Sequence, residues 1–441
     1  METRLKRWFA LEENGTNVGT EIRAGLTSFI TASYIIFVQP AVLSQAGMDF
    51  GSVMTATCLA SALGCLLMGL LANYPILLAP GMGINFYFTY TVVIGQGIPW
   101  ETALGAVFIS GILLIILTLL RVREAIIVLI PNAMKCGIAV GIGLFIAFIG
   151  MTQGGLVVDH PDALVQMGDL RDLPALFTLF GVTLMGALLY RKTPGAILIG
   201  LLVLTALAVP LGLAEFKGII SSPPGIGGTW MKMELGAAFD LGIVTIIAVF
   251  VFVDIFDTAG TLVGVGQQGG FIKDGKLPRA QRALLPDAVA TTFGASAGVS
   301  TVVCYIESSA GVAEGGRTGL TSVVAGLLFL FSLWFFPIAE MIGGGYRQGD
   351  LTLYPITAPV LIIVGCMMVS QCVKINWSAW DEALPAYLII CGIPFTYSIA
   401  DGMALGFISY PLIQLLGGKG RECHWGLYAI AAAFLVRFAW A

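Results

Sequence analysis

Apolar stretches long enough to cross a lipid bilayer recur along the whole chain, separated by short polar loops. A helix needs about 20 mostly apolar residues to span the hydrocarbon core. The pattern predicts two series of spans on either side of a Pro- and Gly-rich loop at 223–228. The first series is 26–44, 51–72, 80–94, 102–120, 126–150, 174–190 and 194–212, and the second is 241–263, 284–298, 304–315, 319–337, 354–373, 384–398 and 403–417. A last apolar stretch, 425–440, is predicted to be an extra span or an interfacial helix.

Two of these segments are too short and irregular for ordinary spans. Segment 80–94 opens with Pro80, Gly81 and Gly83, and segment 304–315 is also rich in glycine. Helix-breaking residues are tolerated at membrane depth only where the freed backbone faces protein or a polar cavity. Paired interrupted segments indicate the binding site of a transporter. Each is the third of seven spans, and an odd-numbered repeat must be inverted, so we expect their N-terminal ends to meet near the midplane.

Composition supports a membrane location. Hydrophobic residues make up 57% of the chain and charged residues only 11%, against about 25% charged in soluble domains. The lipid bilayer is therefore the expected solvent for most of the exterior. The net charge of −4 and the lack of a basic patch argue against nucleic-acid binding. Scattered cysteines and two histidines predict no metal site, and no cofactor is expected.

The distribution of Lys and Arg predicts an orientation. Basic residues concentrate on one set of loops, which includes Arg121, Arg123, Arg191 and Lys192. The positive-inside rule then places these loops and the N-terminus in the cytoplasm. The first apolar run has no small-residue cleavage site and is interpreted as a span rather than a signal peptide. The sequence thus predicts a multi-pass protein of a cell inner (plasma) membrane.

Carboxylates inside predicted spans are the strongest candidates for chemistry. Asp254 and Asp257 lie at i and i+3 in the eighth span, on one helical face, and Glu307 lies where the helix of the tenth segment begins. A carboxylate at the bilayer centre costs at least about 2.5 kcal/mol, so an idle one is not expected. All three are candidates for substrate binding and proton coupling. The sequence does not say which aspartate contacts substrate, and Glu307 has the alternative role of a hydrogen bond to a broken helix end.

Neutral groups near these carboxylates complete the candidate site. Asn85, Phe86 and Ser308 are candidate substrate contacts, and the backbone of Gly81, Gly83 and Ser309 is expected at the half-helix ends. Asn85 has the alternative role of a hydrogen bond between helices, and Phe86 that of plain packing.

Several long motifs in these regions resemble one known family. They are "EIRAGLTSFITASYIIFVQPAVLSQAGMDF", "LLANYPILLAPGMGINFYF", "DIFDTAGTLVGV", "YIESSAGVAEGGRTGLTSVV" and "PFTYSIADGMALGFISY". With them the chain resembles the nucleobase–cation symporter superfamily of the nucleobase/ascorbate transporter type, and within it the AzgA-like guanine/hypoxanthine/adenine permeases. Gln39 departs from the pattern, because asparagine is expected before Pro40.

The resemblance implies an all-α integral membrane fold of about 14 transmembrane segments in a 7+7 inverted repeat. It implies a core domain from 20–123 and 240–340, a gate domain from 124–212 and 350–417, and a C-terminal segment at 418–441. It further implies import of a purine nucleobase (guanine, hypoxanthine or adenine) with a proton as coupling ion, and a homodimer. Asn85, an aspartate of the "DIFDTAG" run and Glu307 would form the substrate site.

Other functions remain open or are disfavoured. A carrier of another nucleobase, such as uracil, xanthine or urate, could use the same fold. A carrier of an inorganic anion should place a positive group near the half-helices, and neither interrupted segment contains one. An intramembrane aspartyl protease needs aspartates on different helices, whereas Asp254 and Asp257 share one. A passive channel needs no carboxylate among broken helices. The chain is therefore expected to be a transporter and not an enzyme.

Overall fold

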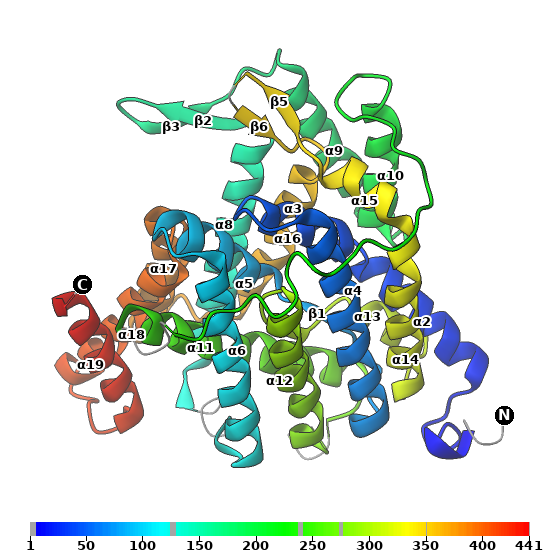
Figure 1. The fold of residues 1–441 in the computed structure, drawn as a ribbon. Coiled ribbons are helices and arrows are strands. Elements are labelled where there is room, and N and C mark those ends of the chain that lie inside the picture. The colour runs from blue at the N-terminus through cyan, green and yellow to red at the C-terminus, as the bar shows by residue number, and fades with distance from the viewer. Residues whose placement is uncertain (1–5, 124–128, 237–240, 273–276, 350, 441) are drawn as a thin grey trace.

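The computed structural model describes residues 6–123, 129–236, 241–272, 277–349 and 351–440, and within them the protein is a bundle of helices (Figure 1). Eight of the described helices or helix pairs are long and apolar enough to cross a membrane. The first half of the chain contains α2 (Val18–Ala32), α3 (Ile35–Ser44), α4 (Phe50–Leu67) with the π-helix η1 (Met68–Ala72), α5 (Met82–Phe86) with the π-helix η2 (Tyr87–Gly95), α6 (Trp100–Leu119), α8 (Asn132–Gln153), α9 (Leu173–Tyr190) and α10 (Ala196–Ala208).

The second half repeats this order. It contains α11 (Leu241–Gln268), α12 (Ala280–Ala297), α13 (Ser308–Ala313), α14 (Gly319–Phe331) with η3 (Ser332–Phe335) and α15 (Phe336–Gly343), α16 (Ala358–Val369) with η4 (Ser370–Lys374), α17 (Trp380–Thr396) and α18 (Ile399–Leu416). The architecture is a 7+7 inverted repeat with core and gate domains. Every span expected from the sequence has a helical counterpart, although residues 126–128 of the fifth lie outside the described ranges.

Short polar side chains set several helix starts. The side chain of Asn17 accepts a hydrogen bond from the backbone N–H of Thr20 at 3.0 Å and caps α2. Asp49 caps α4 in the same way through the N–H of Ser52 at 2.8 Å. Such caps satisfy N–H groups that have no partner within the helix. They fix where α2 and α4 begin.

Both interrupted segments begin with a strand rather than directly with a helix. β1 (Leu78–Pro80) and β4 (Val302–Cys304) pair antiparallel, with Ala79 opposite Val303. The N–H of Gly81 donates to the carbonyl of Thr301, and the N–H of Tyr305 donates to the carbonyl of Leu77, both at 2.9 Å. The two halves thus cross at the middle of the core, and α5 and α13 start on opposite sides of the crossing. Three-residue strands were not expected from the sequence.

Two further hairpins cover one end of the molecule, drawn at the top of Figure 1. One pairs β2 (Val157–His160) with β3 (Leu164–Met167) between α8 and α9, and the other pairs β5 (Tyr346–Gln348) with β6 (Leu351–Leu353) between α15 and α16. The sequence predicted only loops there.

Small residues let α8 pack closely against α16 and α17. A Cβ at Gly137 would lie 3.1 Å from the carbonyl of Ala386 in α17, and one at Gly143 would lie 2.7 Å from the carbonyl of Gly365 in α16. Such spacing is typical of membrane helix interfaces. α8 therefore packs between α16 and α17, while α2, α4, α6, α12 and α14 form a second group of packed helices.

The last apolar stretch forms α19 (Trp425–Trp440), which packs beside α18 (Figure 1). Its Arg437 forms an ion pair with Asp401 of α18 at 2.8 Å. A charge inside an apolar stretch is thus paired with a neighbouring helix, as expected at membrane depth.

Candidate functional site

Glu307 lies directly before α13 and contacts the first span. Its Oε1 accepts a hydrogen bond from the Tyr34 hydroxyl at 2.7 Å. Tyr34 is fully buried at the break between α2 and α3. The break therefore places a hydroxyl against the carboxylate, and a hydrogen bond to a charged acceptor is stronger than a neutral one. The carboxylate itself remains half-buried.

Asp257 faces the start of α5. Its Oδ2 lies 3.7 Å from the position that a Cβ on Gly81 would occupy. The side chain is half-buried, and no described residue is seen to donate a hydrogen bond to it. Asp257 and Glu307 are close enough to interact electrostatically. Both carboxylates belong to the second half of the chain, and they lie beside the strand crossing with acceptor capacity to spare.

Asp254 lies one turn away from Asp257 in a different environment. Its Oδ1 contacts the Arg123 guanidinium at 2.8 Å, and the same guanidinium contacts Asp287 of α12 at 2.6 Å. All three side chains are fully buried. We call this group the Arg123 cluster. Membership of this cluster distinguishes the two aspartates, which the sequence could not do: Asp254 belongs to it, and half-buried Asp257 does not.

Two members of this cluster were missed or misplaced by the sequence interpretation. Arg123 was assigned to a cytoplasmic loop, but it is fully buried because its long side chain extends from the end of α6 between α11 and α12. Asp287 was not singled out. It lies inside predicted span 284–298, so the cost of an intramembrane carboxylate could have identified it.

Asn85 is held between two neighbouring polar side chains. Its amide nitrogen donates to Gln39 of α3, and its carbonyl oxygen accepts from Ser300 just before β4. Asn85 is buried, and so are both partners. This matches the alternative of a hydrogen bond between elements, and we call the three residues the Asn85 clasp. The nitrogen of Gln39 has no hydrogen-bond partner in the described structure.

Phe86 is fully buried and stacks on Tyr90, with ring centroids 5.7 Å apart and planes inclined by 9°. Tyr90 in turn donates to Gln45 at 2.8 Å. The ring of Phe86 therefore packs within the first half of the core in this conformation.

The two candidate serines differ. The Ser308 hydroxyl accepts from the N–H of Leu77 at 2.9 Å and donates to the carbonyl of Tyr305 at 2.6 Å. It stabilises the strand crossing. The Ser309 side chain is half-buried, and its carbonyl accepts from Gln268 at 3.1 Å.

The two candidate glycines permit close approach of other elements. A Cβ on Gly81 would lie 3.0 Å from the side chain of Val303 in β4. A Cβ on Gly83 would lie 2.6 Å from Cγ2 of Ile142 in α8. Gly83 therefore sits at a close contact between α5 and α8.

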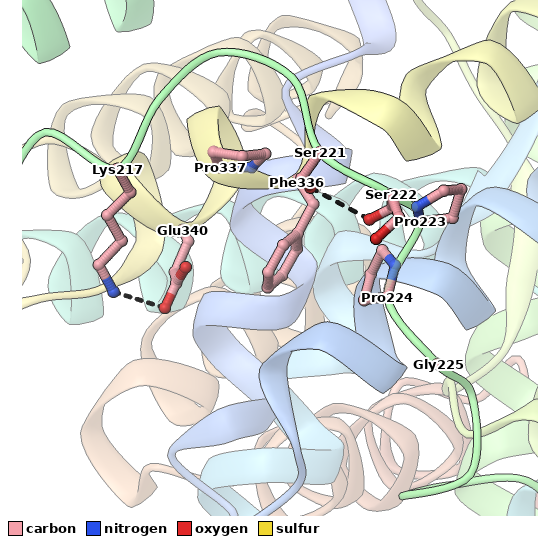
Figure 2. A pocket seen from close by; sticks show the side chains of 9 residues that line it. All are labelled: Lys217, Ser221, Ser222, Pro223, Pro224, Gly225, Phe336, Pro337 and Glu340. Atoms are coloured by element: carbon pink, nitrogen blue, oxygen red, sulfur yellow. Dashed lines mark hydrogen bonds and ion pairs between the residues drawn. The ribbon is translucent and has the colours of Figure 1, made fainter.

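A shallow surface cleft lies elsewhere, between α15 and the loop at 217–225 (Figure 2). Figure 2 shows Lys217 paired with Glu340, at 2.5 Å, along one side of it. None of the candidate site residues lines this cleft. The group around Asp257 and Glu307 is therefore distinct from it.

These features define a class of protein. The fold has solved counterparts in membrane transporters: the transmembrane domain of the cyanobacterial bicarbonate transporter BicA superposes with a TM-score of 0.64 at 16% identity, covering 87% of this chain and 97% of that one. The murine anion transporter Slc26a9 in its inward-facing state gives a TM-score of 0.63 at 11% identity, covering 90% and 68%. At such low identity the likeness shows the fold alone.

Sequence comparison gives the family. The profile of the permease family matches residues 19–405, and the chain belongs to this family of nucleobase/ascorbate transporters. It is a multi-pass membrane transporter and not an enzyme. It is 43% identical to the guanine/hypoxanthine permease PbuO of Bacillus subtilis, over 97% of this chain and 99% of that one. It is 40% identical to the adenine permease AdeP of Escherichia coli, over 98% and 95%, and 48% identical to a putative permease of Methanocaldococcus jannaschii, over 99% and 98%.

Proposed function

We propose that this protein imports purine nucleobases (guanine, hypoxanthine or adenine) together with protons. The observation that carries the proposal is the pair of half-buried carboxylates, Asp257 and Glu307, at the crossing of the two halves. The similarity to guanine/hypoxanthine and adenine permeases over nearly the whole chain supports the choice of substrate.

The chemistry of a purine fits two such acceptors. Its edge carries ring N–H and amino groups, and an ionised carboxylate accepts two such hydrogen bonds side by side. Asp257 has free acceptor capacity, and Glu307 is oriented by Tyr34 at 2.7 Å. We assign Asp257 and Glu307 as the direct contacts. Asn85, Phe86 and Ser308 are already engaged by protein groups, so we assign them to shaping the site.

The transport step is proposed to be a movement of the core against the gate. The core would comprise 20–123 and 240–340, and the gate 124–212 and 350–417, with the contact of Gly83 and Ile142 at their boundary. The excess of Lys and Arg on one set of loops supports a cytoplasmic N-terminus in a cell inner membrane. The family resemblance supports a homodimer as the assembled form.

The test is uptake of radiolabelled hypoxanthine, guanine, adenine and uracil in cells that lack their own nucleobase permeases. The wild type should import purines, and a protonophore should abolish accumulation. Asp257→Asn should abolish uptake. Asp381→Asn, on α17 and away from the strand crossing, should retain it; the Asp381 carboxylate accepts from Gln414 at 3.3 Å and lies 4.0 Å from Lys419. Uptake of uracil alone would refute the purine assignment, and accumulation unaffected by the protonophore would refute proton coupling.

A further inference from the structure

The Arg123 cluster contains more negative than positive charge. One guanidinium faces two carboxylates, those of Asp254 and Asp287, and all three side chains are fully buried. Arginine stays protonated in proteins, so two ionised aspartates leave one excess negative charge. Burying an uncompensated charge is costly, and a buried group neutralises itself instead where it can.

The groups packed around the cluster do not supply the missing positive charge. Along α11 the next ionisable residue is Asp257, which adds repulsion. β4 contributes the thiol of Cys304, and the neutral hydroxyl of Thr258 donates to Asp287 at 2.6 Å. Among the described residues that face Asp254, Arg123 is the one cation. A bound proton is the simplest compensation.

The hydrogen bonds indicate where that proton sits. Both oxygens of Asp287 are occupied, Oδ2 by Arg123 at 2.6 Å and Oδ1 by Thr258 at 2.6 Å. Asp254 uses only Oδ1, and its buried Oδ2 has no donor. The carboxyls of Asp254 and Asp287 are adjacent, because both contact the same guanidinium nitrogen of Arg123, at 2.8 Å and 2.6 Å. Two adjacent carboxyls that cannot both ionise hold one proton between them.

We propose that the Arg123 cluster is the coupling-proton site of this transporter, with the proton shared by Asp254 and Asp287 and separate from the nucleobase at Asp257 and Glu307. The inference rests on the proposed function above. The reaction is a plain protonation: a carboxylate takes a proton from water on one side of the membrane and returns it on the other. Half-buried Asp257, one turn along α11, provides the route from the substrate site to buried Asp254.

The arrangement couples the proton to transport through two contacts. α11 carries both Asp254 and Asp257, so the proton site and the substrate site move together. The N–H of Cys304 in β4 also donates to Thr258 at 3.4 Å, which joins the cluster to the strand that leads to Glu307. Moving the core through lipid is easiest with the least net charge. A protonated cluster with bound substrate therefore favours the crossing over an unprotonated one.

The test uses purified protein in liposomes that enclose a pH-sensitive dye. Added hypoxanthine should acidify the lumen with the wild type. Asp254→Asn and Asp287→Asn each remove the excess charge, so both should keep hypoxanthine counterflow and lose the acidification. Asp254→Glu keeps a titratable group and should retain the acidification. The control is Asp401→Asn, which breaks the separate ion pair with Arg437 and should leave the coupling intact.

Each contrary outcome has its own meaning. Acidification at the wild-type rate in Asp254→Asn or Asp287→Asn overturns the inference. So does loss of counterflow in both variants, because the cluster would then be needed for binding rather than for coupling. A hypoxanthine-driven sodium flux in place of a proton flux also overturns it. If the wild type gives no counterflow with any purine, the proposed function fails instead.

Discussion

The two interrupted segments occupy equivalent places in the repeat but carry different chemistry. α5 and α13 both follow a strand of the same crossing. The residue directly after each strand, Gly81 or Tyr305, donates an equivalent backbone hydrogen bond to the other half. On the α5 side, the polar side chain of Asn85 is already hydrogen-bonded to Gln39 and Ser300. On the α13 side, Glu307 keeps a half-buried carboxylate and a single oriented donor, Tyr34. The backbone of the two interrupted segments is therefore arranged symmetrically, whereas only the α13 side carries a charged side chain.

This difference indicates a division of labour. A neutral clasp with buried partners rigidifies one half-helix, because every broken hydrogen bond would leave an unpaired buried group. A carboxylate with spare acceptor capacity is suited to a ligand that brings its own donors. We therefore expect substitutions on the α13 side to change substrate affinity, and substitutions on the α5 side to change stability or movement.

The largest effect is expected from Glu307→Gln. A hydrogen bond to a charged group contributes about 1.5–3 kcal/mol, so purine affinity should fall by roughly 10- to 150-fold. Binding of hypoxanthine to purified protein measures it. Glu314→Gln, an exposed carboxylate at the end of the same helix, is the matched control and should bind normally. Unchanged affinity in Glu307→Gln would show that the Glu307 carboxylate does not bind the purine, and the proposed difference between the two segments would fail.

Gly83→Ala tests the proposed boundary between core and gate. The new Cβ would lie 2.6 Å from Cγ2 of Ile142, and overpacking costs about 1–3 kcal/mol, or roughly 5- to 150-fold in a conformational equilibrium. Uptake rate should drop while purine affinity changes little. The double variant Gly83→Ala/Ile142→Ala should recover the rate. Gly186→Ala in α9, where nothing lies within 4 Å, should act like wild type; an equal loss there would argue against the contact.

Parts of this picture could be predicted from the sequence. Pro80, Gly81 and Gly83 identified a broken helix at membrane depth, and the cost of a buried carboxylate identified Asp254, Asp257 and Glu307. These signals are local, because each depends on a residue type within an apolar run. The strand crossing could not be predicted, since three-residue strands show no measurable periodicity.

The partners of the charged groups could not be predicted either, because they are distant in sequence. Arg123 lies at the end of an apolar run, as topology-setting arginines do, and only the fold brings it to Asp254 and Asp287. The same limit applies to Tyr34, whose partner Glu307 is in the other half of the chain. An arginine at the end of an apolar run can thus be a solvent-exposed loop residue or the centre of a buried cluster, and the sequence pattern does not distinguish the two cases.

Asn85→Ala should lower stability more than affinity. It leaves the Ser300 hydroxyl and a second polar atom of Gln39 buried without partners, at about 1–3 kcal/mol. The midpoint of thermal unfolding in detergent should therefore fall, with hypoxanthine affinity within about twofold of wild type. Asn376→Ala, at an exposed loop position, should leave the midpoint unchanged. A large loss of affinity at normal stability would instead make Asn85 a direct contact and erase the contrast between the two segments.

Tyr34→Phe is the mildest way to sharpen the comparison. It deletes only the hydroxyl that donates to Glu307 at 2.7 Å. Because this hydroxyl orients the carboxylate and does not itself contact the substrate, the loss in affinity should be smaller than in Glu307→Gln, roughly two- to tenfold. Because the hydroxyl acts through Glu307, its loss should add nothing in the Glu307→Gln background, and a double-mutant cycle measures this. Tyr190→Phe, at an exposed tyrosine, is the control. Fully additive losses would mean that Tyr34 contacts the substrate itself. Binding on the α13 side would then depend on two independent groups, Tyr34 and Glu307, rather than on one carboxylate oriented by Tyr34.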